Sequence, residues 1–71
     1  MGKFRAVVAF RYKDMATIRY IQKRFRMPFK FTVNYECPVE LDDDEEIELL
    51  RETARRGYID IRKGWFEFPK T

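Results

Sequence analysis

The sequence predicts a small α+β fold, in which a single-layer sheet carries two helices in the order β-α-β-α-β-β. Apolar and polar residues alternate over 3–12 and over 29–37, as is typical of half-buried strands. Residues 42–56 start with acids, end with arginines and precede Gly57, as is typical of a helix. The chain of 71 residues is expected to form one compact domain, 1–71.

Residues 3–12 are expected to form the first strand. One side of it carries apolar side chains at alternate positions: Phe4, Ala6, Val8, Phe10 and Tyr12. The other side has Lys3, Arg5 and Arg11 near its ends but Val7 and Ala9 in its middle. A strand that is apolar on both sides at its middle indicates a central strand, or one that is covered on both faces.

Residues 14–26 fit two structures. As a helix, the segment has Asp14 as its N-cap and an apolar stripe at helical spacing: Met15, Ile18, Ile21 and Phe25. As a strand, it places charged side chains on both faces, and the order of elements becomes β-β-β-α-β-β. We prefer the helix, although residues that favour strands, such as Thr17 and Tyr20, keep the alternative open. Pro28 ends the element in either case.

Residues 29–37 are expected to form the next strand. Five residues would lie on its core side: Phe29, Phe31, Val33, Tyr35 and Cys37. Pro38 has no N–H to donate to a sheet. The chain after Pro38 is therefore expected at a sheet edge or outside the sheet.

Residues 42–56 are predicted to form the second helix, with acids and arginines placed to complement the helix dipole. Glu45 lies three residues after Asp42, which is the spacing of a capping box. Gly57 suits the left-handed residue that ends a helix. The expected buried residues are Ile47, Leu50 and Ala54. The expected ion pairs on the exposed side are Glu48–Arg51 and Glu52–Arg56.

Residues 58–68 are predicted to form a β-hairpin. Strands at 58–61 and 65–68 flank the turn Arg62-Lys63-Gly64, in which Gly64 suits the positive φ that such a loop needs. A helix followed by a hairpin with a basic tip is similar to the closing half of a winged-helix domain. The likeness implies a wing that touches the DNA backbone.

The composition argues against several kinds of catalysis. The chain contains no histidine and no serine, which excludes Ser-His and Cys-His nucleophiles and histidine metal sites. Cys37, the one cysteine, is expected to act as a small buried hydrophobe. The helix dipole explains the acids at 42–46 without a metal. We therefore expect no enzyme activity, no cofactor and no metal; the alternative is a ribonuclease that works without histidine.

Charge is segregated along the chain, although the net charge is only +3. Residues 1–30 hold nine Lys or Arg and one acid, whereas residues 31–50 hold eight acids and no base. Residues 51–71 hold six bases and three acids. Such segregation often marks an interaction surface.

The strongest functional signal is the stretch RYIQKRFRMPFK, residues 19–30, which sets five Lys or Arg among aromatic side chains without an acid. On a helix, four of its residues form one row on the outer surface: Arg19, Gln22, Lys23 and Arg26. A row of cations is the electrostatic footprint of phosphate binding. The predicted nucleic-acid-binding residues add cations before the helix and at the hairpin tip: Arg11, Lys13, Arg19, Lys23, Arg26, Arg62 and Lys63.

These features predict a small non-enzymatic protein that binds the phosphate backbone of DNA or RNA. The alternative is a protein-interaction module or homodimeric regulator that uses its basic and acidic segments as complementary patches. No apolar run approaches the roughly 18 residues of a membrane span, and the N-terminus lacks the apolar core of a signal peptide. We therefore expect a cytoplasmic protein with no membrane partner. Many charged residues beside one Gln and one Asn are a trend seen in thermophile proteins.

Overall fold

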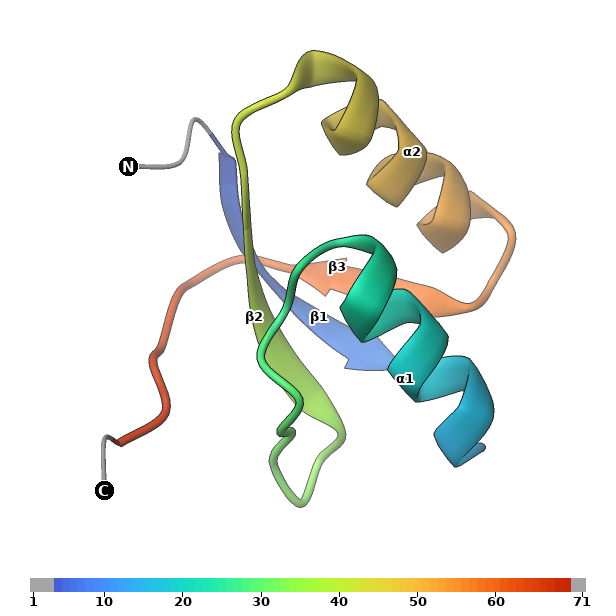
Figure 1. Ribbon diagram of the computed structural model, residues 1–71, viewed down its shortest axis with the longest axis vertical. Coiled ribbons are helices and arrows are strands. Elements are labelled where there is room, and N and C mark those ends of the chain that lie inside the picture. Colours follow the sequence, from blue (N-terminus) through green and yellow to red (C-terminus); the bar gives the residue numbers. More distant parts are fainter. Residues whose placement is uncertain (1–3, 70–71) are drawn as a thin grey trace.

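The computed structural model describes residues 4–69. They form five elements: β1 (Phe4–Phe10), α1 (Met15–Arg24), β2 (Glu36–Leu41), α2 (Asp44–Arg55) and β3 (Ile59–Arg62). The strands make one antiparallel sheet in the order β2-β1-β3, and both helices pack on the same face of it (Figure 1). The prediction of an α+β fold in the order β-α-β-α-β is confirmed, whereas the last predicted strand, 65–68, does not form.

The first strand lies in the middle of the sheet, as its pattern predicted. β1 pairs with β2 along one edge and with β3 along the other, so that Val7 lies opposite both Pro38 and Arg62. Its side chains at alternate positions from Ala6 to Phe10 belong to the core beneath the helices. Val7 and Ala9, which point to the other face, are buried as well. β1 is therefore enclosed on both edges and on both faces.

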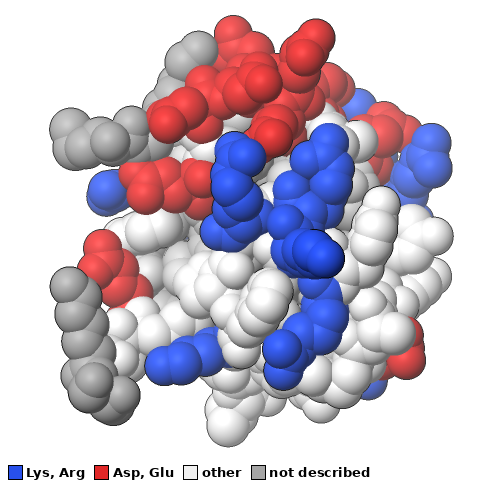
Figure 2. Space-filling model, viewed as in Figure 1, with Lys and Arg blue, Asp and Glu red and all other residues white. Residues whose placement is uncertain are grey.

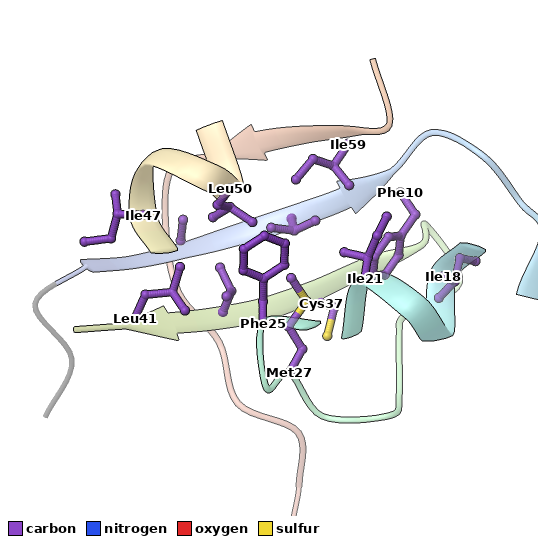
Figure 3. Packing of buried hydrophobic residues seen from close by; sticks show 13 residues of the cluster. Phe10, Ile18, Ile21, Phe25, Met27, Cys37, Leu41, Ile47, Leu50 and Ile59 are labelled. Carbon is purple, nitrogen blue, oxygen red and sulfur yellow. The ribbon is translucent and has the colours of Figure 1, made fainter. Parts of the chain in front are cut away.

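One apolar cluster joins the helices to the sheet. Figure 3 shows Phe25 near the middle of this cluster, with Leu50 of α2 on one side of its ring and Met27 on the other. Ile59 of β3 and Leu41 of β2 lie toward opposite ends of the same cluster. Because Phe25 follows directly after α1, its burial draws the end of that helix onto the sheet.

The segment 14–26, for which helix and strand were both open, contains a helix. The Asp14 carboxylate caps α1 by accepting hydrogen bonds from the Thr17 hydroxyl at 2.8 Å and the Thr17 N–H at 3.0 Å. These two bonds lower the pKa of the Asp14 carboxyl. Ile18 is buried as predicted, but Met15 is 46% exposed. The prediction for Met15 was wrong because the first turn of α1 projects beyond the end of β1 (Figure 1).

Gln22 was predicted on the outer surface of the helix, but it is fully buried. Its Nε2 donates a hydrogen bond to the Lys30 carbonyl at 3.1 Å. The prediction failed because the chain that follows α1 returns along this side of the helix and covers it. The carbonyl is partly buried, and the glutamine amide supplies a hydrogen-bond donor to it.

The strand predicted over 29–37 forms further along the chain. β2 begins at Glu36, runs through Pro38 and ends at Leu41. Pro38 is accommodated because β2 is an edge strand, where a proline can face away from its partner. The expectation that the chain after Pro38 lies at a sheet edge is confirmed, but the strand itself was misplaced.

Residues 26–35 form an irregular connection between α1 and β2. It is bounded by two non-glycine residues with left-handed backbone, Arg26 at φ 57° and Tyr35 at φ 61°. Phe29 and Val33, predicted to face the core, are 55% and 93% exposed. The alternation failed here because the backbone reverses direction twice instead of staying extended.

The second helix matches the predicted element and begins later than predicted. Its N-cap is Asp43 and not Asp42, and the Asp43 Oδ1 accepts a hydrogen bond from the Glu45 N–H at 2.9 Å. Gly57 follows the helix at φ 87°, as predicted. Leu50 is fully buried, also as predicted. The capping box was misplaced because several consecutive acids offer several possible caps.

One of the two predicted ion pairs of this helix forms. Arg56 lies 3.2 Å from Glu52, as predicted. Glu48 pairs with Arg55 at 2.7 Å and not with Arg51. Arg51 instead lies over the ring of Phe4, 5.5 Å from its centroid, because β1 passes beneath that side of the helix.

The predicted hairpin at 58–68 keeps only its first strand. Gly64 has the expected positive φ of 105°, but the chain beyond it leaves the sheet. Trp65 lies under the Arg5 guanidinium, 4.8 Å from the ring centroid, so this C-terminal segment passes beside the outer face of the sheet. The prediction failed because burying the apolar outer face of β1 stabilises the fold. A second hairpin strand would lie beside the sheet and would leave that face exposed to water. The likeness to a winged-helix domain therefore has no wing to support it.

Both helices are short. α1 has 10 residues and α2 has 12. A membrane-spanning helix needs about 20 apolar residues. No helix within residues 4–69 is long and apolar enough to cross a membrane.

Leu50→Ala should lower the free energy of unfolding by about 2–5 kcal/mol, because a fully buried side chain would leave a cavity. Leu49→Ala removes the same atoms from the neighbouring residue, which is 37% exposed, and should cost about 1 kcal/mol or less. Urea unfolding followed by far-UV circular dichroism measures both variants. Equal losses would contradict the placement of Leu50 in the core.

Candidate nucleic-acid interface

The structure divides the seven predicted binding residues among three places. Arg19, Lys23 and Arg26 lie on α1 and the turn after it. Arg11 and Arg62 lie beside the outer face of the sheet, away from the helices. The remaining two, Lys13 and Lys63, follow β1 and β3. The seven cations therefore do not form one continuous surface.

The cations on the outer face of the sheet are already paired with carboxylates. Arg11 lies 3.5 Å from Asp60. Arg62 lies 2.8 Å from Glu36, and this pair reaches across the central strand from β3 to β2. These ion pairs flank the apolar middle of the outer face and complete its cover.

The two lysines in the connections are exposed. The Lys13 ammonium lies 5.1 Å from the centroid of the Tyr35 ring, which is a cation–π contact. Lys63 has no carboxylate partner within residues 4–69. Neither lysine belongs to α1, so each is at most a supporting cation for a site on that helix.

The end of α1 is partly neutralised by the start of α2. Arg26 lies 2.8 Å from the Glu46 carboxylate, and Arg24 lies 3.7 Å from the same group. The Glu46 side chain is mostly buried, so this contact fixes the two helix ends relative to each other. Figure 2 shows acidic side chains gathered over the start of α2, directly beside the basic side chains of α1.

Three neighbouring cations remain without an acidic partner within residues 4–69: Arg19, Lys23 and Lys30. Arg19 and Lys23 lie one turn apart on the exposed side of α1. The hydrogen bond from Gln22 to the Lys30 carbonyl holds Lys30 and Phe29 against the same helix. The Arg19 guanidinium lies over the Phe29 ring, 5.3 Å from its centroid. We call these four residues, Arg19, Lys23, Phe29 and Lys30, the basic–aromatic surface.

Phe29 and Lys30 are the members of this surface that the sequence prediction missed. Both belong to the basic stretch 19–30, but the alternation over 29–37 predicted Phe29 on the core side of a strand. Pro28 was the available signal, because a proline directly before them favours an irregular connection. Gln22 gave no such signal, because a glutamine is equally suited to the exposed row on which it was predicted.

Thiol chemistry has little support. Cys37 is fully buried, and its Sγ lies 3.5 Å from the Pro28 carbonyl oxygen. Burial raises the pKa of the Cys37 thiol to about 11, and hydrogen bonding with Gln22 opposes this only in part. A thiol with this pKa is almost entirely protonated at neutral pH and is a poor nucleophile.

The acidic run at the start of α2 is engaged in the fold. Asp43 caps the helix, and Glu46 holds two arginines. Asp42 and Asp44 also have interaction partners. Across residues 4–69 no three or more Cys, Asp or Glu side chains are grouped in a way that could hold a metal ion.

Comparisons with known proteins give no indication of function. A scan against protein-family models and searches of curated proteins and of solved structures found no match.

Cys37 should react with a thiol reagent at about pH 8 at least about 100-fold more slowly than an ordinary thiol, because the raised pKa leaves about a hundredth of the thiolate. The reaction rate is measured from the absorbance of the thiolate that the reagent releases, in the native protein and in protein unfolded by urea. Val33→Cys is the control, since it places a thiol at a position that is 93% exposed and should react at once. Rapid labelling of native Cys37 would contradict its burial.

Proposed function

We propose that this chain is a non-enzymatic nucleic-acid-binding protein and that the basic–aromatic surface is its binding face. The observation that carries the proposal is the grouping of Arg19, Lys23 and Lys30, which have no acidic partner within residues 4–69. Neighbouring cations without a counter-charge attract phosphates and release the counterions bound to them. The exposed ring of Phe29 adds an apolar face on which a base can stack.

Three of the other predicted cations contribute less to this proposal. Arg11, Arg26 and Arg62 already hold carboxylates, and a phosphate would have to displace these partners. Lys13 and Lys63 remain as supporting cations, because charge acts over about 10 Å at moderate salt.

Binding through this surface should depend on the backbone more than on base sequence. Asn and Gln read adenine through paired hydrogen bonds, and the chain has one of each. Gln22 is buried and bonded to the Lys30 carbonyl, so it has no contact to offer to a base. Phosphate contacts position a protein on nucleic acid but carry no direct sequence information.

Lys23→Glu should weaken binding to a labelled oligonucleotide several-fold and should lower the slope of log affinity against log salt by about 1. Lys63→Glu is the matched comparison: it makes the same change of charge at an exposed lysine outside the basic–aromatic surface, and because Lys63 is only a supporting cation it should weaken binding clearly less than Lys23→Glu. Fluorescence anisotropy across a salt series measures both variants.

Equal effects of the two substitutions would contradict a localised binding face and would leave only a general attraction by net charge. If the unsubstituted chain binds neither DNA nor RNA at low salt, the proposed function itself is wrong.

A second candidate function is self-association through the groove between α1 and α2. The groove has a volume of about 520 Å³, and Tyr20, Leu49 and Tyr58 line it with partly exposed apolar surface. Tyrosine is enriched at the energetic centres of protein interfaces. The segregated charges favour this candidate less, because Glu46 already pairs with arginines of the same chain.

Leu49→Glu should make the chain monomeric if this groove is a dimer interface, because a buried unpaired charge opposes association. Sedimentation velocity over a range of concentrations measures the change. Val33→Glu, at an exposed apolar residue outside the groove, is the control and should leave the mass distribution unchanged. If the unsubstituted chain stays monomeric at every concentration, self-association through this groove is excluded.

A further inference from the structure

A second concave site adjoins the basic–aromatic surface. A cleft of about 700 Å³ is lined by the connection after α1, by the edge strand β2 and by the C-terminal segment, which lies on the side of β2 away from the helices (Figure 1). Phe29 contributes to the lining from the connection, and Trp65 and Phe68 contribute from the C-terminal segment. The volume lies within the range of sites that hold small organic groups.

The aromatic side chains of the cleft are suited to stacking. Arg19 lies over the Phe29 ring, and Arg5 lies over the Trp65 ring. Phe29 is nevertheless 55% exposed, so part of its surface remains open to a ligand. Bases that are not paired stack on aromatic rings and on arginine planes in single-strand-binding proteins.

Charge is distributed unevenly between the cleft and its surroundings. Arg19 and Lys23 lie on the helix beside the cleft, and Lys30 lies on its wall. Two charged groups of the lining are already paired, Arg26 with Glu46 and Glu40 with Arg5. Glu67 also lies within the lining, and its carboxylate repels phosphates but accepts hydrogen bonds from the amino groups of bases. The backbone of a bound strand is therefore favoured along the cations, and a neutral base is favoured inside the cleft.

We propose that the nucleic acid bound by this chain is single-stranded and that one unstacked base enters the cleft between Phe29 and Trp65. This inference rests on the proposed function and specifies its ligand class. Arg19, Lys23 and Lys30 hold the phosphates on either side of that base. A duplex does not fit this arrangement, because its bases are stacked on one another and present only their edges in the grooves.

The test compares a labelled single-stranded oligonucleotide with the duplex of the same sequence, using the full chain at one salt concentration. Anisotropy should give several-fold tighter binding of the single strand. Phe29→Leu should weaken single-strand binding by about 5- to 150-fold, which is the range for loss of one stacked base. It should leave duplex binding nearly unchanged.

Tyr20→Leu is the matched control. Tyr20 is also an exposed aromatic residue next to the cations of α1, but it lines the groove toward α2 and not the cleft. This variant should bind the single strand like the unsubstituted chain. Circular dichroism of both variants confirms that each is folded.

The fluorescence of Trp65, the one tryptophan, provides a measurement that needs no substitution. A base that enters the cleft should quench it, and a duplex bound to the cations should not. Equal affinity for single strand and duplex, with no effect of Phe29→Leu and no quenching, overturns this inference and leaves the proposed function standing. Failure to bind either oligonucleotide at low salt overturns the proposed function as well.

Discussion

The fold depends on the enclosure of β1, which is apolar on both of its faces. The helices cover the face that carries Val8, and the opposite face has Val7 and Ala9 at its middle. Burial of apolar surface stabilises a protein by about 25 cal/mol per Å², so a small domain gains by covering both faces. A fourth strand would extend the sheet at its edge and leave the outer face bare. This explains why the chain after Gly64 leaves the sheet and Trp65 packs under Arg5 instead.

The candidate site is a consequence of the same covering. The connection 26–35 returns along α1 because Gln22 satisfies the Lys30 carbonyl, and this contact presents Phe29 beside Arg19. The C-terminal segment supplies the other wall of the cleft. Ion pairs then decide which cations remain available. Glu46 neutralises the end of α1, whereas no acid within residues 4–69 reaches the exposed side of its middle.

The sequence pattern correctly predicted those elements whose formation depends on residues within the element itself. The central place of β1 follows from its two apolar sides, and α2 follows from its charged ends and Gly57. The sequence could not show that Arg26 and Tyr35 adopt left-handed backbone, because a positive φ is expected mainly at glycine and rarely at arginine or tyrosine. The alternation over 29–37 therefore suggested a strand where a loop exists. The row along α1 was predicted with Arg19 and Lys23 exposed, but its neutral member, Gln22, is covered by chain that returns from further along.

The position of β1 in the sheet also has a consequence for the order in which the protein folds. The central strand is the first element of the chain, and its partners come much later: Phe4 pairs with Leu41, and Val7 pairs with Arg62. Contacts between residues so distant in sequence require closure of long loops, which slows folding. A ribosome must synthesise the chain as far as Arg62 before β1 can pair along its second edge. Until then one edge of this apolar strand is unpaired, and unpaired apolar strand edges are prone to aggregate.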